Sequence, residues 1–577
     1  MNIHSLLVSR FSQALEEMGV TDAPVPVTRS ARPEFGEYQF NGAMALAKQL
    51  RQKPRDIAQT ILSTVKLDDV ATKLEVAGPG FINIHLSNEW LSERCNQALN
   101  DNRLGIAKAP AKTVVVDYSS PNLAKEMHVG HLRTTIIGDA VVKTLEFLGH
   151  NVIRQNHMGD WGTQFGMLLA HLSDKLAENA VAETALSDLE DFYREAKVRF
   201  DEEDGFADRA REYVVKLQSG DEQCMTLWHQ FIDVSIAHSE EVYDKLNVSL
   251  TREDIKGESA YNDDLANVVT DLKAAGLAVE DQGAQVVFIP ELADKEGNPA
   301  VYIVQKSGGG YLYATTDLAA IRYRNKVLGA DRTLILTDAR QALHFKQTEI
   351  VARKAGFIEE NQTYEHCPFG MMLGSDGKPF KTRSGGTVKL VELLDEAVER
   401  AGALVAERST DLDEAARNQV AKTVGIGAVK YADLSKNRTT DYMFSWDSML
   451  SFEGNTAPYL QYAYTRIQSI FRKAGVDVAQ LSKAISLDAA QEHTLAVQLL
   501  QFEEVVGAVS REGTPHVLCS YLYELASAFM SFYEACPILK SDVEPAVKES
   551  RLALASLTAN ALKLGLDLLG IDTLDKM

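Results

Sequence analysis

Apolar residues recur every three to four positions at the start of the chain, which predicts an amphipathic helix. These positions are Leu7, Phe11, Leu15 and Met18. Pro54 predicts the start of a further helix, because proline is tolerated in a first helical turn. Residues 74–76 and 81–84 alternate between apolar and polar side chains, as two strands would. The pattern predicts a small α+β N-terminal domain over residues 1–105.

The pattern changes at residues 114–116, a run of valines that is typical of a buried parallel strand. A polar loop follows, and then a helix with Leu132 and Ile136 on one face. Residues 152–153 are expected to form the next strand, so that strand, helix and strand make one right-handed βαβ unit. Later strands are expected at residues 284–288, 302–305 and 333–336. We predict an α/β catalytic domain over residues 112–400, with a doubly wound, Rossmann-like parallel sheet.

Two further segments are predicted to be helical. Residues 171–247 are charged and contain no proline, and we expect them to form a helical insertion within the α/β domain. From residue 415 to residue 577 the apolar pattern is almost wholly helical, which predicts an all-α C-terminal bundle. No apolar run in the sequence is long enough to span a bilayer, so we expect no membrane partner.

Charge and cysteine content narrow the class of protein. The chain has 59 basic and 81 acidic residues and a net charge of −22, which argues against a general nucleic-acid coat. A specific RNA partner stays possible, because phosphate binding depends on the local field. The 5 cysteines are scattered and form no Cys-x-x-Cys pair, and residues 1–5 lack the layout of a secretory signal. These features predict a cytoplasmic protein.

The tetrad His128-Val129-Gly130-His131 lies where a predicted parallel strand hands over to a helix. Open α/β sheets bind ligands at this place, and helix N-termini offer free N–H groups to phosphates. Gly130 lets a nucleotide approach the backbone. The tetrad therefore predicts a nucleotide site. The alternative is that two histidines at a helix start simply flank a packing glycine.

The residues around the tetrad carry a family resemblance. Residues 117–133 resemble the HIGH signature of class I aminoacyl-tRNA synthetases, in the form found in bacterial arginyl-tRNA synthetases. Four other segments resemble the same family, namely residues 157–166, 370–374, 433–438 and 455–462. The resemblance implies a ligase that activates L-arginine with ATP and Mg²⁺ and transfers it to the terminal adenosine of tRNA(Arg). It also implies a monomer with no DNA partner.

The same resemblance implies roles at the ATP site. His128 and His131 would be catalytic and bind the ATP phosphates, with Gly130 under the adenine. A second family signature, KMSKS, is degenerate here, and the family is thought to compensate with a lysine before the HIGH segment. Lys125 occupies that position and would supply the charge. The residues of the degenerate loop that would surround the phosphates are Lys378, Lys381 and Arg383, although a solvated basic hairpin is the alternative for each.

The expected arginine pocket also follows from the resemblance. The candidate residues are Asp117, Asn122, Glu258, Tyr313, Asp317 and Gln341. Asp317 and Glu258 would face the guanidinium, whose five donors suit a bidentate carboxylate. Asp117 and Asn122 would contact the α-amino and α-carboxylate groups. Taken alone, Asp317 could instead cap a helix over residues 318–327.

Contacts to tRNA are expected on both end domains. The candidates are Phe35, Tyr38 and Asn41 in the N-terminal domain, and Tyr459, Gln461 and Arg466 in the C-terminal bundle. Aromatic side chains can stack on unpaired bases. The alternative for each aromatic side chain is a place in the core of its domain.

Three other functions remain open at this point. A class I synthetase of another specificity is disfavoured by the paired acids Asp317 and Glu258, which suit neither an apolar nor an acidic substrate. A small nucleotidyltransferase could share the His-x-Gly-His site, but such enzymes are usually short and do not need a helical bundle. A catalytically inactive RNA-binding relative is disfavoured by the intact Lys125, His128 and His131.

Overall fold

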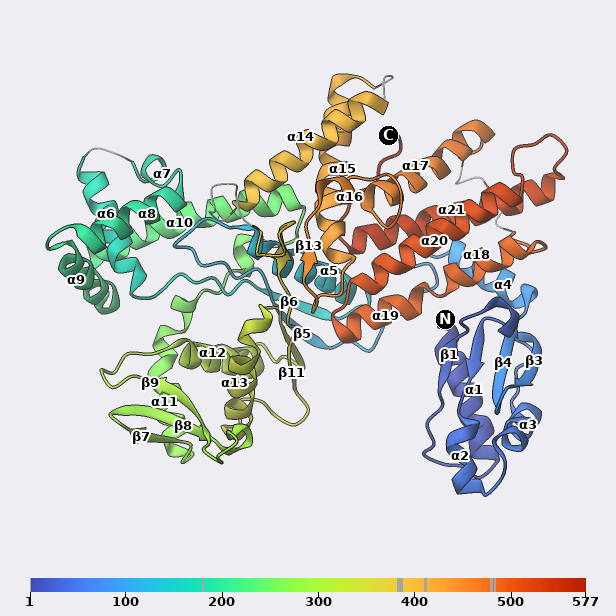
Figure 1. Cartoon of the computed structure of the whole chain (residues 1–577), viewed down its shortest axis with the longest axis horizontal. Coiled ribbons are helices and arrows are strands. Elements are labelled where there is room, and N and C mark those ends of the chain that lie inside the picture. The colour runs from blue at the N-terminus through green and yellow to red at the C-terminus, as the bar shows by residue number, and fades with distance from the viewer. Residues whose placement is uncertain (1, 179–180, 381–387, 409–411, 478–480, 482–483) are drawn as a thin grey trace.

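The protein has a central α/β core with helical or mixed bodies on either side of it (Figure 1). The structure is a computed structural model that describes residues 2–178, 181–380, 388–408, 412–477, 481 and 484–577. The helical insertion forms one end of the molecule, and the C-terminal bundle separates the core from the N-terminal domain. Within the described ranges, no helix combines the length and the apolar character needed to cross a membrane.

The N-terminal domain is an antiparallel sheet covered by helices, as the α+β pattern predicts. Its strands are β1 (Val27–Arg29), β2 (Tyr38–Phe40), β3 (Ala71–Ala77) and β4 (Phe81–Leu86), in the order β1-β2-β4-β3. Its helices are α1 (Ile3–Glu17), η1 (Pro33–Phe35), α2 (Ala43–Leu50) and α3 (Pro54–Thr64), followed by α4 (Asn88–Leu99). The predicted helical face of α1 is confirmed: Leu7, Phe11 and Leu15 are buried, and Phe11 stacks on Phe40 with ring centroids 4.5 Å apart.

The catalytic core contains a four-stranded parallel sheet in the order β11-β10-β5-β6. The strands are β5 (Thr113–Asp117), β6 (Asn151–Gln155), β10 (Arg332–Ile335) and β11 (Thr363–His366). The 3₁₀ turn η2 (Val129–His131) and helix α5 (Leu132–Phe147) connect β5 to β6. This arrangement confirms the predicted βαβ unit and the parallel sheet. Other helices of the core are α11 (Asn262–Ala274), α12 (Tyr313–Arg322), α13 (Ala342–Lys354) and α14 (Leu390–Arg408), with short turns η3 (Arg252–Asp254), η4 (Glu258–Tyr261), η5 (Pro290–Leu292), η6 (Tyr323–Val327) and η7 (Ala339–Gln341).

Two of the expected later strands belong to a different sheet. Residues 284–288 and 302–305 do form strands, but they pair in a separate antiparallel sheet of β7 (Ala278–Asp281), β8 (Ala284–Ile289) and β9 (Ala300–Gln305). The connection between β7 and β8 consists of Gln282 and Gly283, both at positive φ. Such a two-residue turn can join only antiparallel neighbours, since parallel strands need a long crossover. The assignment of these segments to the parallel sheet was therefore wrong.

The insertion and the C-terminal region are helical, as predicted. The insertion comprises α6 (Gln164–Ala177), α7 (Ala182–Ala185), α8 (Leu189–Glu202), α9 (Phe206–Ser219) and α10 (Glu222–Leu246). The C-terminal helices are α15 (Glu414–Leu434), α16 (Trp446–Met449), α17 (Ala457–Ala474), α18 (Ala490–Leu500), α19 (Phe502–Glu512), α20 (His516–Ala535) and α21 (Pro545–Leu568). One short parallel pair, β12 (Met372–Leu373) with β13 (Tyr442–Met443), ties the core to the chain that follows α15.

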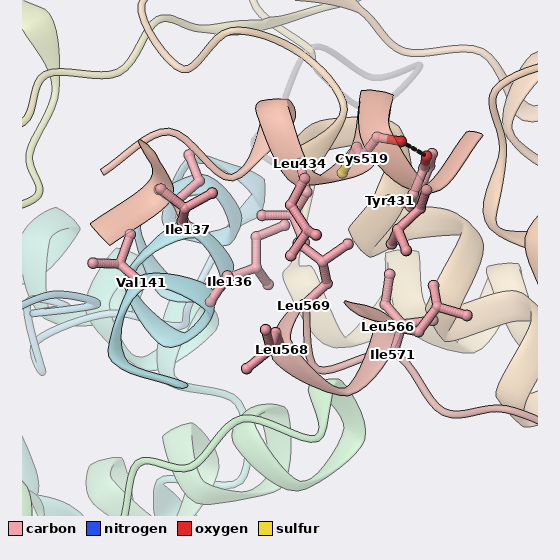
Figure 2. Close-up of a cluster of buried hydrophobic side chains, with 14 of the residues drawn as sticks. Ile136, Ile137, Val141, Tyr431, Leu434, Cys519, Leu566, Leu568, Leu569 and Ile571 are labelled. Carbon is pink, nitrogen blue, oxygen red and sulfur yellow. Dashed lines mark hydrogen bonds between the residues drawn. The ribbon is translucent and has the colours of Figure 1, made fainter. Parts of the chain in front are cut away.

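Helix α5, which follows the His128–His131 tetrad, packs against the C-terminal bundle. Figure 2 shows Ile136 of α5 facing apolar side chains of α15 and of the chain around the end of α21, whereas Ile137 and Val141 lie on the other side of α5; all of these side chains are buried. Leu434 and Leu569 belong to this cluster. Helix α5 and the C-terminal bundle therefore share one hydrophobic core, and neither can shift without disturbing the other.

Replacing Ile136 by alanine should test this shared core. Ile136 is fully buried, so the truncation removes apolar contacts and leaves a cavity, which typically costs about 2–5 kcal/mol. We expect a lower midpoint in the chemical denaturation curve followed by circular dichroism. The matched control is Val198→Ala, because Val198 is 48% exposed on the insertion and should change stability by less than about 0.5 kcal/mol. Equal shifts for the two variants would contradict the shared core.

Candidate active site

The candidate site lies at the carboxyl ends of three neighbouring strands. Asp117 ends β5 and lies in register with Gln155 of β6 on one side and Ile335 of β10 on the other. The loops that follow these strands therefore leave the sheet at the same edge. Ligands of open α/β sheets bind at this edge, which agrees with the position of the His128–His131 tetrad.

The tetrad forms a reciprocally capped turn. The backbone N–H of Gly130 donates to Nδ1 of His128 at 3.0 Å, and the backbone N–H of His128 donates to Nδ1 of His131 at 3.1 Å. The two rings lie with centroids 4.1 Å apart. A Cβ atom on Gly130 would come within 2.6 Å of Cε1 of His128, so only glycine lets this ring fold over the backbone. Gly130 therefore packs against the ring of His128, and this contact fixes the orientation of the ring.

These backbone bonds determine which nitrogen of each imidazole carries its proton. Because Nδ1 of both His128 and His131 accepts a backbone N–H, the neutral ring must carry its proton on Nε2. Burial, and to a lesser extent the neighbouring His128, lowers the pKa of His131 to about 3. Burial and the charge of Lys125 lower the pKa of His128. Both rings are therefore neutral near pH 7, and each has an Nε2–H to donate.

The loop after β5 contains two residues in left-handed conformations that glycine usually adopts. Ser119 has φ 68° and Ser120 has φ 47°, a strain of about 1–3 kcal/mol at each residue. Hydrogen bonds maintain the turn: the Ser120 N–H donates to Oδ1 of Asn156 at 2.9 Å, and the Ser120 hydroxyl donates to Oδ1 of Asp117 at 2.8 Å. Strain of this kind is typical of functional sites, where the rest of the fold maintains it.

Asp117 is buried, and both of its oxygens already have protein partners. Nη2 of Arg324 donates to Oδ2 of Asp117 at 2.6 Å, and Nε of the same arginine donates to Gln155. The hydroxyl of Ser120 occupies Oδ1. Asp117 was expected to contact arginine directly. In the structure it accepts a hydrogen bond from Ser120 and so stabilises the strained turn.

Asp317 lies in the second turn of α12, which begins at Tyr313 with Leu312 as its N-cap. The alternative that Asp317 caps a helix is therefore wrong. Nε2 of His344, on α13, donates to Oδ2 of Asp317 at 2.5 Å, and Nε2 of His157 lies 4.0 Å from Oδ1. The carboxylate is mostly buried but retains an exposed fraction of 20%, so one side of it stays open to a ligand.

Glu258 begins the 3₁₀ turn η4 and shares the acidic environment of Asp317. Burial, followed by the charges of Asp160 and Asp317, raises the pKa of Glu258 to about 8. The side chain lines a cleft of about 490 Å³ between the insertion, the loop after β6 and the segment before α12. Other residues lining the cleft are Trp161, Gln164, Lys306, Tyr311, Tyr313 and Thr316. Glu258 thus lines the cleft, and the charge of Asp317 acts on it from nearby.

The remaining arginine-site candidates are exposed, and one of them, Tyr313, lines this cleft. Tyr313 is 73% exposed, and Gln341 is exposed at the end of η7. Asn122 is exposed in the loop after β5, where its Oδ1 accepts from the Ala124 N–H and from Gln164. Because these three side chains are already exposed, they can contact a small molecule without any rearrangement of the core.

The degenerate loop is joined to the tetrad at its far end. The Val129 N–H donates to the Val388 oxygen at 3.0 Å, and the Leu390 N–H donates to the Met127 oxygen at 2.9 Å. At the near end, Lys378 is exposed and lies in a tight turn that starts at Gly374. Two of the expected phosphate-binding residues, Lys381 and Arg383, lie outside the described residues.

Lys125 lies on the exposed surface of the loop before the tetrad. Its ammonium lies 4.2 Å from the ring centroid of Tyr193, on α8 of the insertion. The same charge contributes to the lowered pKa of His128, so Lys125 and the tetrad share one electrostatic environment.

Two of the expected tRNA contacts are buried. Tyr38 is fully buried, and its hydroxyl donates to Oε1 of Glu504 at 2.6 Å. Gln461 is also fully buried and donates to the backbone oxygens of Thr423 and Asp572. Neither side chain can touch RNA in this structure, so both assignments need correction: these residues join parts of the protein to one another.

The other tRNA candidates are at least partly accessible. Phe35 and Asn41 are half-buried on the N-terminal domain. On α17, Tyr459 packs beside Tyr523, and the guanidinium of Arg466 lies 5.2 Å from the ring centroid of Tyr533. Tyr462, which the sequence reasoning did not select, is 44% exposed on the same helix.

The sequence reasoning also missed His344 and Arg324. Each holds a candidate carboxylate, and each lies on a helical segment distant in sequence from its partner. No local pattern marks them, because only the packing of α12, α13 and the sheet brings them to Asp317 and Asp117. His157 could have been found, since it stands in one of the segments that carry the family resemblance.

Comparison with protein families places three known domains on the chain. The family described as "tRNA synthetases class I (R), catalytic domain" matches residues 94–446. The "DALR anticodon binding domain" matches residues 460–577, and the "Arginyl tRNA synthetase N terminal domain" matches residues 5–86. The matches follow the core, the C-terminal bundle and the N-terminal domain described above.

Individual relatives agree with these matches. The chain is 80% identical over 577 residues to a curated protein named arginine–tRNA ligase from Alteromonas mediterranea, with 100% of both chains covered. It is 62% identical over 584 residues to another of that name from Colwellia psychrerythraea, also covering 100% of both. Among solved structures, arginyl-tRNA synthetase from Plasmodium falciparum superposes with a TM-score of 0.87 at 31% identity, covering 100% of this chain and 99% of that one. The Thermus thermophilus arginyl-tRNA synthetase gives 0.84 at 26% identity, covering 100% of both.

Proposed function

The chain belongs to the arginyl-tRNA synthetase family and acts as an arginine–tRNA ligase, and from that premise we propose which of its residues perform the reaction. The observation that carries the proposal is the geometry at one sheet edge. Two neutral imidazoles whose Nε2–H groups have no hydrogen-bond partner among the described residues lie at the start of α5, and Glu258, which is influenced by the charge of Asp317, lines a cleft. The first arrangement suits phosphates, and the second suits a guanidinium.

In the first step, a carboxylate oxygen of arginine attacks the α-phosphorus of ATP. A bond forms between that oxygen and the phosphorus, and the bond to the bridging oxygen breaks, so that pyrophosphate leaves with the electron pair. The carboxylate is already ionised at neutral pH, so no general base is required. His128 and His131 donate from Nε2 to phosphate oxygens and stabilise the charge that develops there.

In the second step, the 2′-hydroxyl oxygen of the terminal tRNA adenosine attacks the activated carbonyl carbon. The new ester bond forms as the bond from that carbon to the phosphate oxygen breaks, so that AMP leaves with the electron pair and the hydroxyl proton is released. The protein's part in both steps is mainly to hold the reacting groups together. Asn122, Tyr313 and Gln341 are exposed at the edge of the site, where they can orient the amino acid. Asp117 acts indirectly, by holding the turn at Ser120.

Asp317 and Glu258 select arginine by charge. A guanidinium is always charged and offers several N–H donors, so it pairs best with an ionised carboxylate of fixed orientation. His344 fixes the carboxylate of Asp317 from the side opposite the ligand. Glu258 adds a second carboxyl group to this acidic environment and offers further acceptor oxygens to the guanidinium donors.

Lys125 supplies positive charge to the departing pyrophosphate, with Lys378, Lys381 and Arg383 approaching from the loop. Mg²⁺ enters with ATP, bound mainly by the substrate's own phosphates, as is usual for this ion. In the part of the chain that is described, no group of three or more His, Cys, Asp or Glu side chains could hold a metal ion.

A charging assay tests the proposed specificity. Purified protein with ATP, Mg²⁺ and tRNA(Arg) should form an ester between radiolabelled arginine and tRNA, and should not do so with lysine. Lysine has the same charge but lacks the planar fork of donors. Comparable charging with lysine would overturn the assignment of the pocket.

The rate at different pH values should report the ionisation of Glu258. Because the pKa of Glu258 is raised to about 8, the carboxyl is mostly protonated in the empty pocket at pH 7. A bound guanidinium favours the ionised form, so binding lowers this pKa and releases a proton. We expect the KM for arginine to fall as pH rises toward about 8, by at most about tenfold per pH unit. Glu258→Gln should flatten this dependence, and an unchanged slope in that variant would exclude Glu258 as its source.

We propose tRNA(Arg) contacts on the accessible candidates. Phe35 and Asn41 serve on the N-terminal domain, and Tyr459, Arg466 and the exposed Tyr462 serve on α17. We further propose a monomer that works in the bacterial cytoplasm and binds neither DNA nor membranes. The buried free thiols of all five cysteines are consistent with a reducing compartment.

A further inference from the structure

We propose that Tyr193, on the helical insertion, is a positioning residue for Lys125: its ring holds the lysine ammonium in place for the phosphates. The inference rests on the proposed role of Lys125 and extends it to α8, no residue of which lines the cleft at Glu258. The ammonium lies 4.2 Å from the centroid of the Tyr193 ring, within the range of a cation–π contact.

An aromatic ring is suited to this task because it orients a cation without neutralising it. A carboxylate partner would compete with pyrophosphate for the ammonium, whereas the ring offers only the weak negative potential of its face. Among the described residues, Lys125 forms no ion pair with a carboxylate. The adjacent Glu126 is engaged elsewhere, since its Oε1 accepts the Leu189 N–H at 3.2 Å and lies 3.4 Å from Nδ1 of His238. The full charge of Lys125 is therefore available.

The first turn of α8 is attached directly to the active-site segments. Asp188 caps α8 and forms an ion pair with Lys389 at 2.6 Å. Lys389 in turn forms a backbone bridge with His128. Together with the bond from the Leu189 N–H to Glu126, these contacts fix the start of α8 against both sides of the phosphate site.

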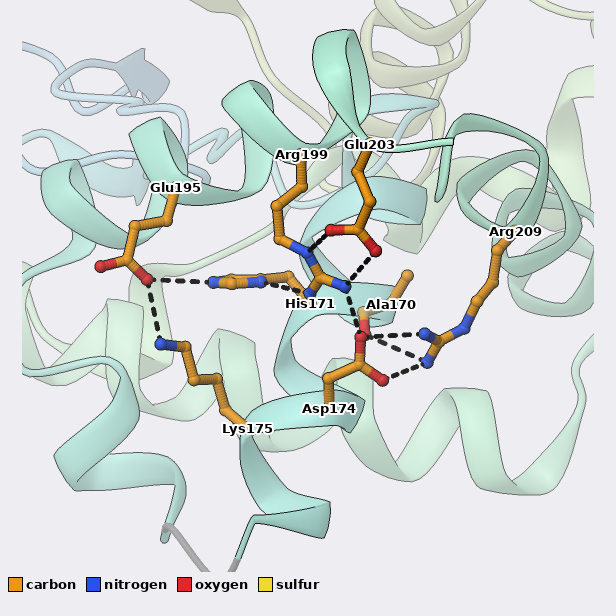
Figure 3. Close-up of polar contacts among 8 residues, drawn as sticks. All are labelled: Ala170, His171, Asp174, Lys175, Glu195, Arg199, Glu203 and Arg209. Carbon is orange, nitrogen blue, oxygen red and sulfur yellow. Dashed lines mark hydrogen bonds and ion pairs between the residues drawn. The ribbon is translucent and has the colours of Figure 1, made fainter. Parts of the chain in front are cut away.

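The rest of α8 is fixed to the insertion by a network of polar side chains (Figure 3). Asp174 of α6 accepts from Arg199 of α8 at 2.9 Å and from Arg209 of α9 at 2.6 Å. His171 lies between Arg199 and Glu195, two residues of α8, at 2.9 and 3.3 Å. Tyr193 stands between these two sets of anchors. Its ring is thus a fixed surface, whereas a free lysine side chain would sample many rotamers.

The test compares ATP–pyrophosphate exchange, with tRNA present, in variants of the full chain. Tyr193→Leu keeps an apolar side chain but removes the ring, and we expect its exchange rate to fall about two- to fivefold with the KM for arginine unchanged. Tyr193→Phe keeps the ring and should stay near the wild-type rate. The matched control is Phe200→Leu, because Phe200 is a half-buried aromatic residue of the same helix with Lys197 over its ring at 5.2 Å, and its loss should leave exchange unchanged.

A double-mutant cycle separates positioning from general damage to the fold. Lys125→Ala alone should slow exchange by about tenfold or more. Adding Tyr193→Leu to it should cause no further loss, because the ring acts only through the lysine. A wild-type rate in Tyr193→Leu, or the same loss with and without Lys125, would overturn the inference while the role of Lys125 stands. A wild-type rate in Lys125→Ala would overturn both.

Discussion

Replacing Asp317 by asparagine should raise the KM for arginine by a factor of about 30 to several thousand, the equivalent of about 2–5 kcal/mol. The side chain keeps its size, and its amide oxygen can still accept from His344, so the pocket should keep its shape. What disappears is the negative charge opposite the guanidinium. Pyrophosphate exchange measured over a range of arginine concentrations, with tRNA present, gives the value.

Citrulline provides the control for this prediction, because it replaces the guanidinium of arginine by a neutral urea of nearly the same shape. The wild-type protein should discriminate strongly against citrulline, and Asp317→Asn should reduce that discrimination. If Asp317→Asn left the KM for arginine and the preference over citrulline unchanged, the carboxylate would have only a structural role on α12.

Replacing His128 by asparagine should lower the turnover of pyrophosphate exchange by about 100- to 1000-fold, the usual effect of removing a donor to developing charge. Asparagine is a good N-cap, so its Oδ1 can still accept the Gly130 N–H that Nδ1 of His128 accepts. The variant therefore keeps the capped turn and loses only the Nε2–H. Its melting temperature should remain near that of the wild type.

The complementary variant, His128→Gln, should keep a donor near the position of Nε2 and lose the cap of the turn. Its amide can reach the position of Nε2 but is poorly placed to cap the turn. We expect it to recover part of the turnover that asparagine loses. If His128→Asn kept a wild-type turnover, the histidine would serve only as a cap of η2, and the phosphate donors would have to come from another part of the site.

Local sequence patterns were sufficient for most elements of the fold. The spacing of Leu7, Phe11 and Leu15 identified α1, and the valine run at residues 114–116 identified the buried strand β5. Each pattern reports which face of a single element is buried, and burial is what a periodic sequence encodes. Such a pattern does not tell which strands pair with one another. Residues of β8 and β9 were recognised as strands, but they form a separate sheet because β8 pairs with β7 across the turn at Gln282-Gly283 and with β9 on its other side.

In the candidate site, too, some features could be predicted from the local sequence, and others depend on how distant segments pack together. His128, Gly130 and His131 follow one another in the sequence, so their capped turn could be anticipated from a strand that leads into a helix. The partners of the carboxylates could not, because Arg324 reaches Asp117 and His344 reaches Asp317 only after helices pack on the sheet. Burial also decided against two tRNA candidates. Tyr38 takes the core position that was its stated alternative, and the amide of Gln461 donates to backbone oxygens of the protein.

We propose that ATP activation and arginine selection occupy two separable parts of one sheet edge. Steady-state pyrophosphate exchange on His128→Asn and Asp317→Asn, with tRNA present and both substrates varied, can distinguish the two parts. We expect His128→Asn to lower turnover with little change in the KM for arginine. Asp317→Asn should raise the KM for arginine with little change in the KM for ATP. Loss of the same kinetic parameter in both variants would contradict this proposal.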